Sequence, residues 1–343
     1  MLAGWGVHYI TTSRLYPELA NIMLPILLLR IAMIFRTNNF DLLRLLAAFQ
    51  VLIGHTLSCF ELGGVPWAGY FPGVPIFFAI SGFLISASWE RSHSLSGYFT
   101  NRFLRIYPAL WLCFILSVFI VSLTYDFKIL DIEFLKWSIA QLTIGQFYNP
   151  DFLRDYGVGV INGSLWTIPV ELQFYILVPF IYFFMNKLNW NNYIFITFII
   201  LFSFINHYRY IYQPIYGEIL YFKLFAVTVT PYLNMFLFGM FLQRNIYIVE
   251  RFLAKKGLVW LGIYVLSIFI TDYLGISNSG NSINPLSAIL LTFLVISISY
   301  SYTDIFSNLL KGNDISYGIY IYHMIFVNFF LSLDLFSSEV NVA

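Results

Sequence analysis

The sequence predicts an all-α, polytopic membrane protein: a transmembrane helical bundle with about nine to ten membrane helices around a central cavity. Of its 343 residues, 59% are hydrophobic and only 10% are charged, whereas a soluble domain has about 25% charged residues. So few charges could not cover a water-exposed surface, so most of the surface must face a lipid bilayer. The formal net charge of +1 gives no reason to expect a nucleic-acid partner.

Nine segments are apolar and long enough to cross a hydrocarbon core of about 30 Å, which takes about 20 residues. In chain order they are 40–60, 72–89, 103–124, 165–185, 192–208, 218–242, 257–274, 285–302 and 314–334. A tenth segment, 134–148, is shorter and more polar, so it either crosses the bilayer or only dips into it or lies on its surface. The connections are brief, so we expect one membrane domain over residues 38–335 and a short tail over 336–343.

Residues 1–37 are expected to form an N-terminal extension. The apolar run 23–35 is interrupted by Arg30, and no small-residue cleavage site of a secretory signal follows it. Met33 offers an alternative start, which would make residues 1–32 an in-frame extension without a defined fold.

The positions of Lys and Arg predict the orientation, because cytoplasmic loops carry an excess of both. Basic residues form three groups along the chain: Arg36; Arg91 and Arg102; and Arg244, Arg251, Lys255 and Lys256. If segment 134–148 does not cross the membrane, all three groups share the cytoplasmic face. If it crosses, the third group lies on the opposite side. We favour the first arrangement.

The first predicted span contains three ionisable side chains. An Arg or Asp at the centre of a membrane helix costs about 2.5–3.5 kcal/mol even on the most lenient scale. Arg44 and His55 are eleven residues apart, so they share one helix face, about 16 Å apart along its axis, and Asp41 can pair with Arg44. Snorkelling of Arg44 to the interface and a hydrogen-bonded core role for His55 are the alternatives. Their shared face favours a functional site.

Arg102 and Arg105 lie three residues apart at the start of the third span. Paired guanidinium groups suit phosphate, although anchoring at a cytoplasmic interface would explain either arginine alone. The step from Tyr107 to Pro108 predicts a kink or break in this helix.

Glu171 lies within an apolar span and needs a partner. In the favoured orientation its helix enters from outside, so Glu171 and His55 reach a similar depth. A carboxylate beside a histidine fixes its tautomer and raises its basicity, as a general base for a hydroxyl requires. In the other orientation Glu171 would lie near Arg44. The five histidines show no metal-ligand spacing, so no metal site is expected.

Two further segments carry small or polar residues inside spans. Ser81 and Gly82 in the second span indicate close helix packing. Tyr317 and His323 lie in the last span, where we interpret His323 as a packed, hydrogen-bonded residue rather than a catalytic one.

Five ordered motifs resemble those of the acyltransferase-3 family of integral membrane acyltransferases, and together they cover nearly the whole chain. They are RLLAAFQVLIGH with Arg44 and His55, FFAISGFLI with Ser81, RFLRIYP with Arg102, Arg105 and Tyr107, SLWTIPVELQFY with Trp166, Glu171 and Tyr175, and SYGIYIYH with Tyr317 and His323. Two positions depart from the family pattern: Thr167 replaces a serine, and Pro169 stands in a helix that usually lacks it.

The resemblance implies transfer of an acyl group, expected to be acetyl, from cytoplasmic acyl-CoA to a hydroxyl of a cell-surface polysaccharide or related carbohydrate. It also implies a bacterial inner (plasma) membrane protein with no permanently bound cofactor, in which acyl-CoA is the donor substrate. Arg44, Arg102 and Arg105 would hold the donor phosphates. His55 would act as the general base, with Glu171 orienting it or meeting the acceptor. Supporting roles would fall to Asp41, Ser81, Tyr107, Trp166, Tyr317 and His323. Direct transfer and a transient acyl-histidine are both compatible with these residues.

Two other classes of protein remain as alternatives. A transporter or flippase for a lipid-linked saccharide would use intramembrane charges and kinked helices without chemistry, although no internal halves are detected. An inactive scaffold of an envelope-polymer assembly is the other. By the resemblance, members of the family commonly carry one more apolar helix after the Tyr-His segment. This sequence shows no such helix before Ala343, which keeps the scaffold as an alternative.

Overall fold

The computed structural model describes residues 38–92, 94–126, 131–188, 190–276, 280–281, 283–306, 309–310 and 313–333. Within these ranges every regular element is a helix. The all-α prediction is therefore confirmed for the described chain. The expected N-terminal extension and the tail over 336–343 lie outside the described residues.

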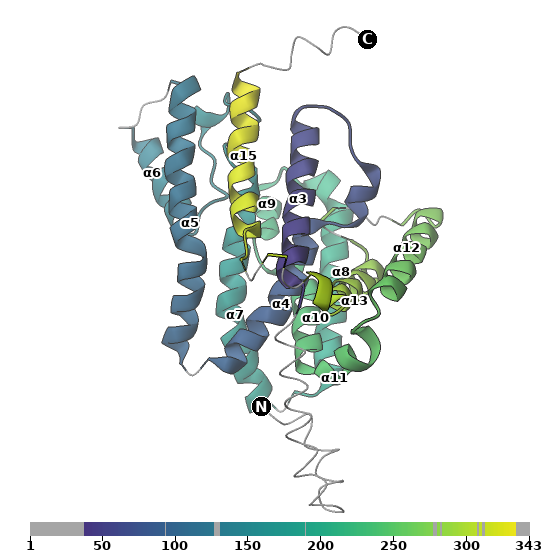
Figure 1. Ribbon diagram of the computed structural model, residues 1–343. Helices are drawn as coiled ribbons and strands as arrows, with labels where there is room; N and C mark the ends of the chain where they lie inside the picture. Colours follow the sequence, from purple (N-terminus) through teal and green to yellow (C-terminus); the bar gives the residue numbers. More distant parts are fainter. Residues whose placement is uncertain are drawn as a thin grey trace, which may run out of the picture.

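Helices α3 (Phe40–Cys59), α5 (Leu95–Thr124) and α15 (Ser316–Ser332) stand side by side, with α15 between the other two (Figure 1). Helix α5 is one continuous helix of 30 residues that contains Pro108. Of the predicted kink or break at this proline, the break is therefore wrong, and the kink stays a prediction. Membrane helices tolerate an internal proline where their surroundings satisfy the freed backbone carbonyl.

Helix α4 (Gly73–Arg91) is central to the bundle, where it packs on α3, α7 (Thr167–Lys187), α10 (Leu233–Arg244) and α13 (Pro285–Ser299). Two glycines bring α4 and α10 together. A Cβ atom on Gly82 would lie 1.9 Å from the backbone oxygen of Phe236, and one on Gly239 would lie 2.1 Å from that of Ala79. Small residues allow this close approach, so the packing role predicted for Gly82 is confirmed.

In the part of the chain that the structure describes, five helices are long and apolar enough to cross a membrane, or up to seven if each of two bent pairs is one span. The five are Phe40–Cys59, Pro66–Arg91, Leu95–Thr124, Gly163–Lys187 and Asn192–Tyr216, the last being α8. The first bent pair joins Leu220–Ala226 (α9) to Thr230–Arg244 at 49°. The second joins Ile246–Leu253 to Gly257–Tyr273 (α12) at 86°.

The predicted count of nine to ten membrane helices is thus not confirmed in the described residues. Helices α13 and α15 have 15 and 17 residues, fewer than the roughly 20 that a straight crossing takes. A hydropathy pattern counts apolar residues but does not report where a helix bends or how long it is.

Segment 134–148 does not cross the fold. Its helix, α6 (Ile132–Leu142), has 11 residues and is therefore about 16 Å long. The Tyr148 hydroxyl donates to Glu133 Oε2 at 2.9 Å, so the end of the segment returns beside its start. The carbonyl of Leu142 accepts from Trp111 Nε1 on α5 at 3.1 Å. This short hairpin supports the arrangement in which 134–148 does not cross the bilayer but dips into it or lies on its surface.

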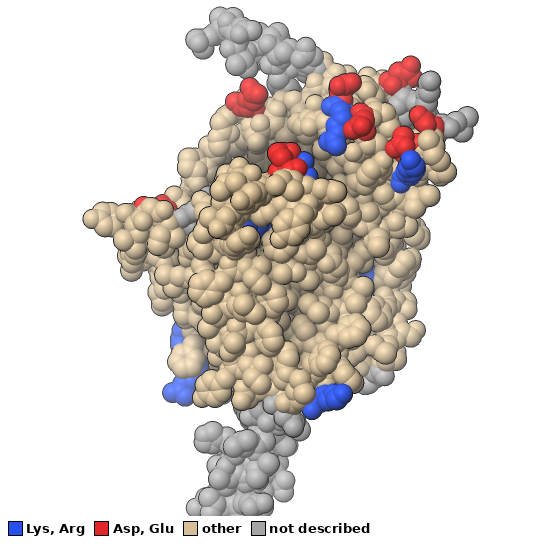
Figure 2. Space-filling model, turned by 180° about the vertical axis from the view of Figure 1, so that it is seen from behind, with Lys and Arg blue, Asp and Glu red and all other residues tan. Residues whose placement is uncertain are grey.

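Charged side chains are concentrated at the two ends of the molecule (Figure 2). On the face shown there, the lower end carries Lys and Arg without Asp or Glu, while most Asp and Glu side chains lie at the upper end. The broad region between is almost free of charge, as a surface in contact with lipid must be. Together with the five long apolar helices, this makes the chain an integral membrane protein.

We expect Gly82→Ala to lower the midpoint of thermal unfolding in detergent, because the new Cβ would meet a backbone atom of α10 that no rotamer change can move aside. Overpacking of this kind typically costs about 1–3 kcal/mol. The matched control is Gly262→Ala on α12, where nothing lies within 4 Å of the added Cβ. Equal midpoints for the two variants would contradict the close packing of α4 on α10.

Candidate functional site

A cavity of about 50 Å³ lies where α3, α4, α5, α7 and α15 meet. It has room for a few water molecules. Its apolar walls come from Val74, Phe77, Phe78 and Ile168, and its polar lining consists of Arg44, Ser81, Arg105, Thr167, Glu171, Ser316, Tyr317 and Tyr320. The bundle therefore encloses ionisable side chains from three different helices in one cavity.

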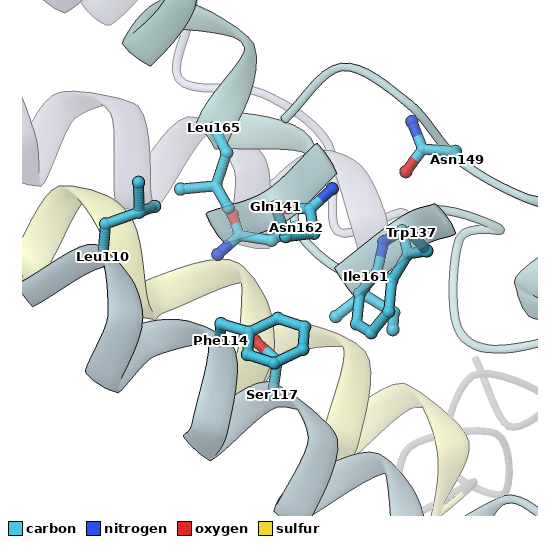
Figure 3. A pocket seen from close by; sticks show the side chains of 9 residues that line it. All are labelled: Leu110, Phe114, Ser117, Trp137, Gln141, Asn149, Ile161, Asn162 and Leu165. Carbon is cyan, nitrogen blue, oxygen red and sulfur yellow. The ribbon is translucent and has the colours of Figure 1, made fainter. Parts of the chain in front are cut away.

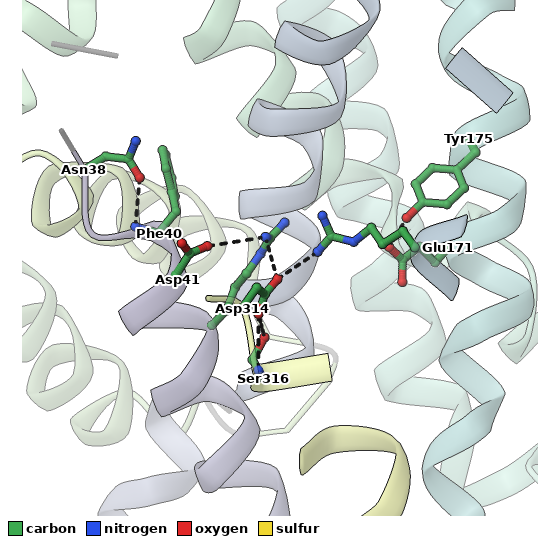
Figure 4. A network of polar contacts seen from close by, with 9 residues as sticks. Asn38, Phe40, Asp41, Glu171, Tyr175, Asp314 and Ser316 are labelled. Atoms are coloured by element: carbon green, nitrogen blue, oxygen red, sulfur yellow. Dashed lines mark hydrogen bonds and ion pairs between the residues drawn. The ribbon is translucent and has the colours of Figure 1, made fainter. Parts of the chain in front are cut away.

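Asp314 joins the two arginines of this cavity (Figure 4). Its Oδ2 accepts from Arg44 Nη1 at 3.0 Å and from Arg105 Nη2 at 3.1 Å. Its Oδ1 accepts from the backbone N–H of Ser316 at 3.2 Å and from the Ser316 hydroxyl. One carboxylate thus ties α3 and α5 to the start of α15. The sequence analysis did not single out Asp314, although an acidic residue just before an apolar span was a signal that could have indicated it.

Arg44 is almost fully enclosed, with only 6% of its side chain exposed. Asp41 lies 4.0 Å away on the same helix, so the predicted pair is present, but Asp314 is the closer partner. The alternative in which Arg44 snorkels to the interface is wrong, because its guanidinium group points into the bundle.

Glu171 lies in the same cavity as Arg44 and Arg105, and it accepts a hydrogen bond from the Tyr175 hydroxyl. The expected pairing of Glu171 with His55 is therefore wrong, since the ring of His55 bonds to another residue. Figure 4 shows Glu171 and Tyr175 on α7, facing the ion pairs around Asp314.

The path of the chain before α7 explains this error. Residues 157–166 run along α15 in the direction opposite to that helix: the N–H of Val158 donates to Asn328, and Asn162 donates to the carbonyl of Ile321. Helix α7 then begins beside Tyr320, whose hydroxyl accepts from Thr167 Oγ1 at 3.1 Å. Its first turn is thus already deep in the bundle, at the level of the charged cavity.

His55 is paired with His323. His55 Nδ1 and His323 Nε2 are 2.9 Å apart, and the two rings are stacked with centroids 5.1 Å apart. His323 Nδ1 lies 2.8 Å from the carbonyl oxygen of Tyr320. The prediction that His323 is packed and hydrogen-bonded is confirmed, but its partner was missed. Arg44 bonds to Asp314 just before α15, and His55 bonds to His323 within α15. Both side chains therefore point from α3 toward the same neighbour, and their predicted common face is confirmed.

Arg102 and Arg105 make different contacts in this structure. Its Nη2 donates to Ser88 Oγ at 2.6 Å, and its guanidinium carbon lies 5.5 Å from the ring centre of Tyr175 and 5.7 Å from that of Tyr98. Such cation–π contacts hold an arginine without neutralising it. The two arginines that the sequence grouped as a pair therefore have different partners.

The remaining candidate residues lie at different distances from the cavity. Ser81 lines it and is 8% exposed. Tyr317 also lines it, with its hydroxyl donating to a backbone carbonyl of α5 at 3.2 Å. Trp166 packs against the ring of Tyr232 at a centroid distance of 5.3 Å. Tyr107 donates to the carbonyl that follows α6, so its role is to hold the hairpin rather than to line the site.

A second cavity lies between α5, α6 and residues 161–165 (Figure 3). Its volume is about 10 Å³, enough for about one water molecule. Its amides are already used: Gln141 donates to the carbonyl of Gln146 at 3.4 Å, and Asn162 donates to that of Ile321 at 2.6 Å. This cavity is part of the packing of the hairpin and does not offer a binding site.

The comparisons with known proteins agree with the motifs. The family model described as "Acyltransferase domain", the acyltransferase-3 family, matches residues 37–339. The chain belongs to the acyltransferase-3 family. It is therefore a membrane O-acyltransferase, as two relatives named O-acetyltransferases also indicate.

Three relatives show how far the similarity extends. Nodulation protein 10 of Rhizobium leguminosarum bv. viciae is 29% identical over 317 residues, which are 86% of this chain and 84% of that protein. The O-acetyl transferase of Shigella phage Sf6 is 36% identical over 152 residues, 41% of this chain and 45% of that protein. Peptidoglycan O-acetyltransferase OatA of Listeria monocytogenes is 30% identical over 152 residues, 41% of this chain and 23% of that protein. No solved structure matches the chain.

We expect Asp314→Ala to lower the free energy of unfolding by about 3 kcal/mol, because it removes the closest carboxylate partner of both Arg44 and Arg105. This is the low end of the range for breaking a buried ion pair, since the Asp314 side chain is 24% exposed. Unfolding in detergent micelles measures the change.

The control for this prediction is Asp304→Ala in the short helix α14 (Thr303–Phe306), where the aspartate is exposed. Its effect should stay within about 0.5 kcal/mol. A loss of similar size in both variants would show that Asp314 does not have the structural role assigned to it.

Proposed function

We propose that the protein transfers an acyl group, in the simplest case acetyl, from cytoplasmic acyl-CoA to a hydroxyl of a cell-surface polysaccharide or related carbohydrate. One observation carries the proposal. A single face of α3 presents Arg44 in a charged cavity and, about 16 Å further along the axis, His55 in a hydrogen-bonded histidine pair. This separation suits a reaction that binds an anionic donor at one depth and activates a hydroxyl at another.

The donor phosphates bind, in this proposal, at Arg102 and Arg105. Among the described residues the Nε of Arg102 is buried without a hydrogen-bond partner, and 34% of the Arg105 side chain is exposed. Arg105 can therefore donate to a phosphate directly, and Arg102 can do so once donor binding opens its surroundings. Arg44 does not bind the donor directly in this proposal. It forms an ion pair with Asp314, and Asp314 in turn orients Arg105.

The acyl-carrying arm of the donor extends from these arginines toward His55. Pockets for drug-sized ligands have volumes of about 300–1,000 Å³, whereas the cavity measures about 50 Å³. Donor binding must therefore move α3, α4 and α15 apart near Phe77 and Tyr320, whose rings meet at a centroid distance of 5.5 Å. Glu171 belongs to the donor side of this path, beside Arg105.

The chemistry is assigned to His55. Its imidazole takes the proton of the acceptor hydroxyl while the hydroxyl oxygen attacks the thioester carbonyl. The bond from carbon to sulfur then breaks, an ester forms, and the CoA thiolate leaves and receives the proton from the imidazolium.

We expect His55→Ala to abolish transfer of labelled acetyl from acetyl-CoA to cell-surface glycan in membrane vesicles. The variant should remain inserted at the wild-type level, because His55 is only half-buried. His207→Ala on α8 is the matched control and should remain active. Transfer at the wild-type rate by His55→Ala would end the proposal. Saccharide movement across the vesicle membrane without any acetyl transfer would favour a flippase instead.

We expect Arg102→Gln to raise the KM for acetyl-CoA about tenfold or more with a smaller effect on kcat, because one charge-assisted hydrogen bond contributes about 1.5–3 kcal/mol. Initial rates against acetyl-CoA concentration measure both constants. Lys187→Gln, at an exposed position that ends α7, is the control for loss of a surface cation. A KM that is the same in the two variants would remove Arg102 from the donor site.

A further inference from the structure

We propose that His323 is a positioning residue that fixes the tautomer of His55, so that Nε2 of His55 is the nitrogen that acts as the base. This inference rests on the proposed function, in which His55 activates the acceptor hydroxyl. It deepens that function by naming the reactive atom and the group that selects it.

The hydrogen bonds around the two rings determine where the protons lie. A carbonyl oxygen can only accept, so the contact of 2.8 Å to the Tyr320 oxygen requires a proton on His323 Nδ1. A neutral imidazole carries one N–H, so His323 Nε2 then has a lone pair. The contact of 2.9 Å between this atom and His55 Nδ1 therefore requires His55 Nδ1 to donate, which leaves the lone pair of His55 on Nε2.

The burial of His323 favours the neutral form of its ring, on which this assignment of protons depends. The residue is 5% exposed, and a charged group with so little access to water is costly. If His323 were an imidazolium ion, its Nε2–H would donate to His55 Nδ1 and move the His55 proton to Nε2, which would remove the base. Two imidazolium rings in contact would also repel each other. The neutral chain from His55 through His323 to the Tyr320 carbonyl is the arrangement that leaves a base in place.

The anchoring of Tyr320 explains how the protein holds this chain of hydrogen bonds. Its hydroxyl donates to the carbonyl of Ser164 at 3.2 Å and accepts from Thr167 Oγ1 at 3.1 Å. Ser164 lies in the short turn just before α7 and Thr167 is the first residue of α7, so α15 is fixed to the chain at this point. When His55 Nε2 takes the acceptor proton, the positive ring that forms still donates through Nδ1 to His323, which stabilises it.

The test compares three substitutions that differ in what they offer to His55. His323→Gln places an amide oxygen near the former Nε2 and can accept from His55 Nδ1. His323→Asn can still donate to the Tyr320 carbonyl but is too short to reach His55, and His323→Leu can do neither. All three are compared with the wild type for abundance in the membrane and for thermal midpoint.

We expect kcat to fall about 10–100-fold in the Leu and Asn variants, a part of the 10²–10⁴ that general acid–base catalysis typically supplies, and to recover most of this loss in the Gln variant. The KM for acetyl-CoA should not change, because His323 is not among the residues that line the charged cavity. Equal kcat values for Gln and Leu would overturn the inference, since a role in packing alone does not depend on an acceptor atom.

A second measurement does not depend on the His323 variants or on activity. Nitrogen NMR of wild-type protein labelled at histidine, assigned by the signals missing in His55→Ala, reports which ring nitrogen carries the proton. We expect the proton on Nδ1 of His55 under conditions where both rings are neutral; a proton on Nε2 would overturn the inference. Absence of acetyl transfer by the wild type would instead count against the proposed function and leave this measurement to decide the tautomer.

Discussion

The ion pairs of Asp314 with Arg44 and Arg105 are the contact on which the arrangement of this bundle depends. A buried arginine without a partner costs several kcal/mol, so α3 and α5 must each remain within reach of the segment that begins α15. The charges thereby fix the depth of α15 relative to both neighbours. Hydrophobic contacts alone would not do so, because apolar side chains tolerate sliding along a lipid-facing helix far better than a guanidinium group tolerates the loss of its carboxylate.

The same contact explains why His323 meets His55. From Arg44 to His55 the axis of α3 rises about 16 Å. From Asp314 the chain passes Ile315 and then rises about 10 Å over about two turns of α15, from Ser316 to His323. Helices α3 and α15 are thus joined at two levels, by an ion pair at one and by a pair of imidazoles at the other. The spacing of Arg44 and His55 in the sequence is matched by the spacing of their partners.

Features that depend on a single helix were predictable from the sequence, whereas contacts between two helices were not. The common face of Arg44 and His55 follows from helical periodicity alone, and the motifs indicated Glu171 because a carboxylate in an apolar span is costly. The partner of Glu171 was not predictable in this way. It depends on residues 157–166, which the amide of Asn328 and the carbonyl of Ile321 hold against α15 before α7 begins.

The count of membrane helices shows the same limit. Hydropathy detected segment 218–242 as one span, but the bend of 49° within it and the bend of 86° between Ile246–Leu253 and Gly257–Tyr273 depend on how the chain packs in three dimensions. The order of the motifs was sufficient to indicate the family, since it needs only the linear sequence. The positions of Asp314 and His323 beside their partners needed the fold.

The small size of the charged cavity limits how much water can surround its charged side chains. A protein that carries arginines and carboxylates inside the bilayer is a potential leak for protons and ions if water connects its two sides. Here the cavity has room for only a few water molecules, and His55 is not part of its lining. The rings of Phe77 and Tyr320 meet at its wall. At this cavity the described residues therefore leave too little space for a continuous column of water beside the charged groups.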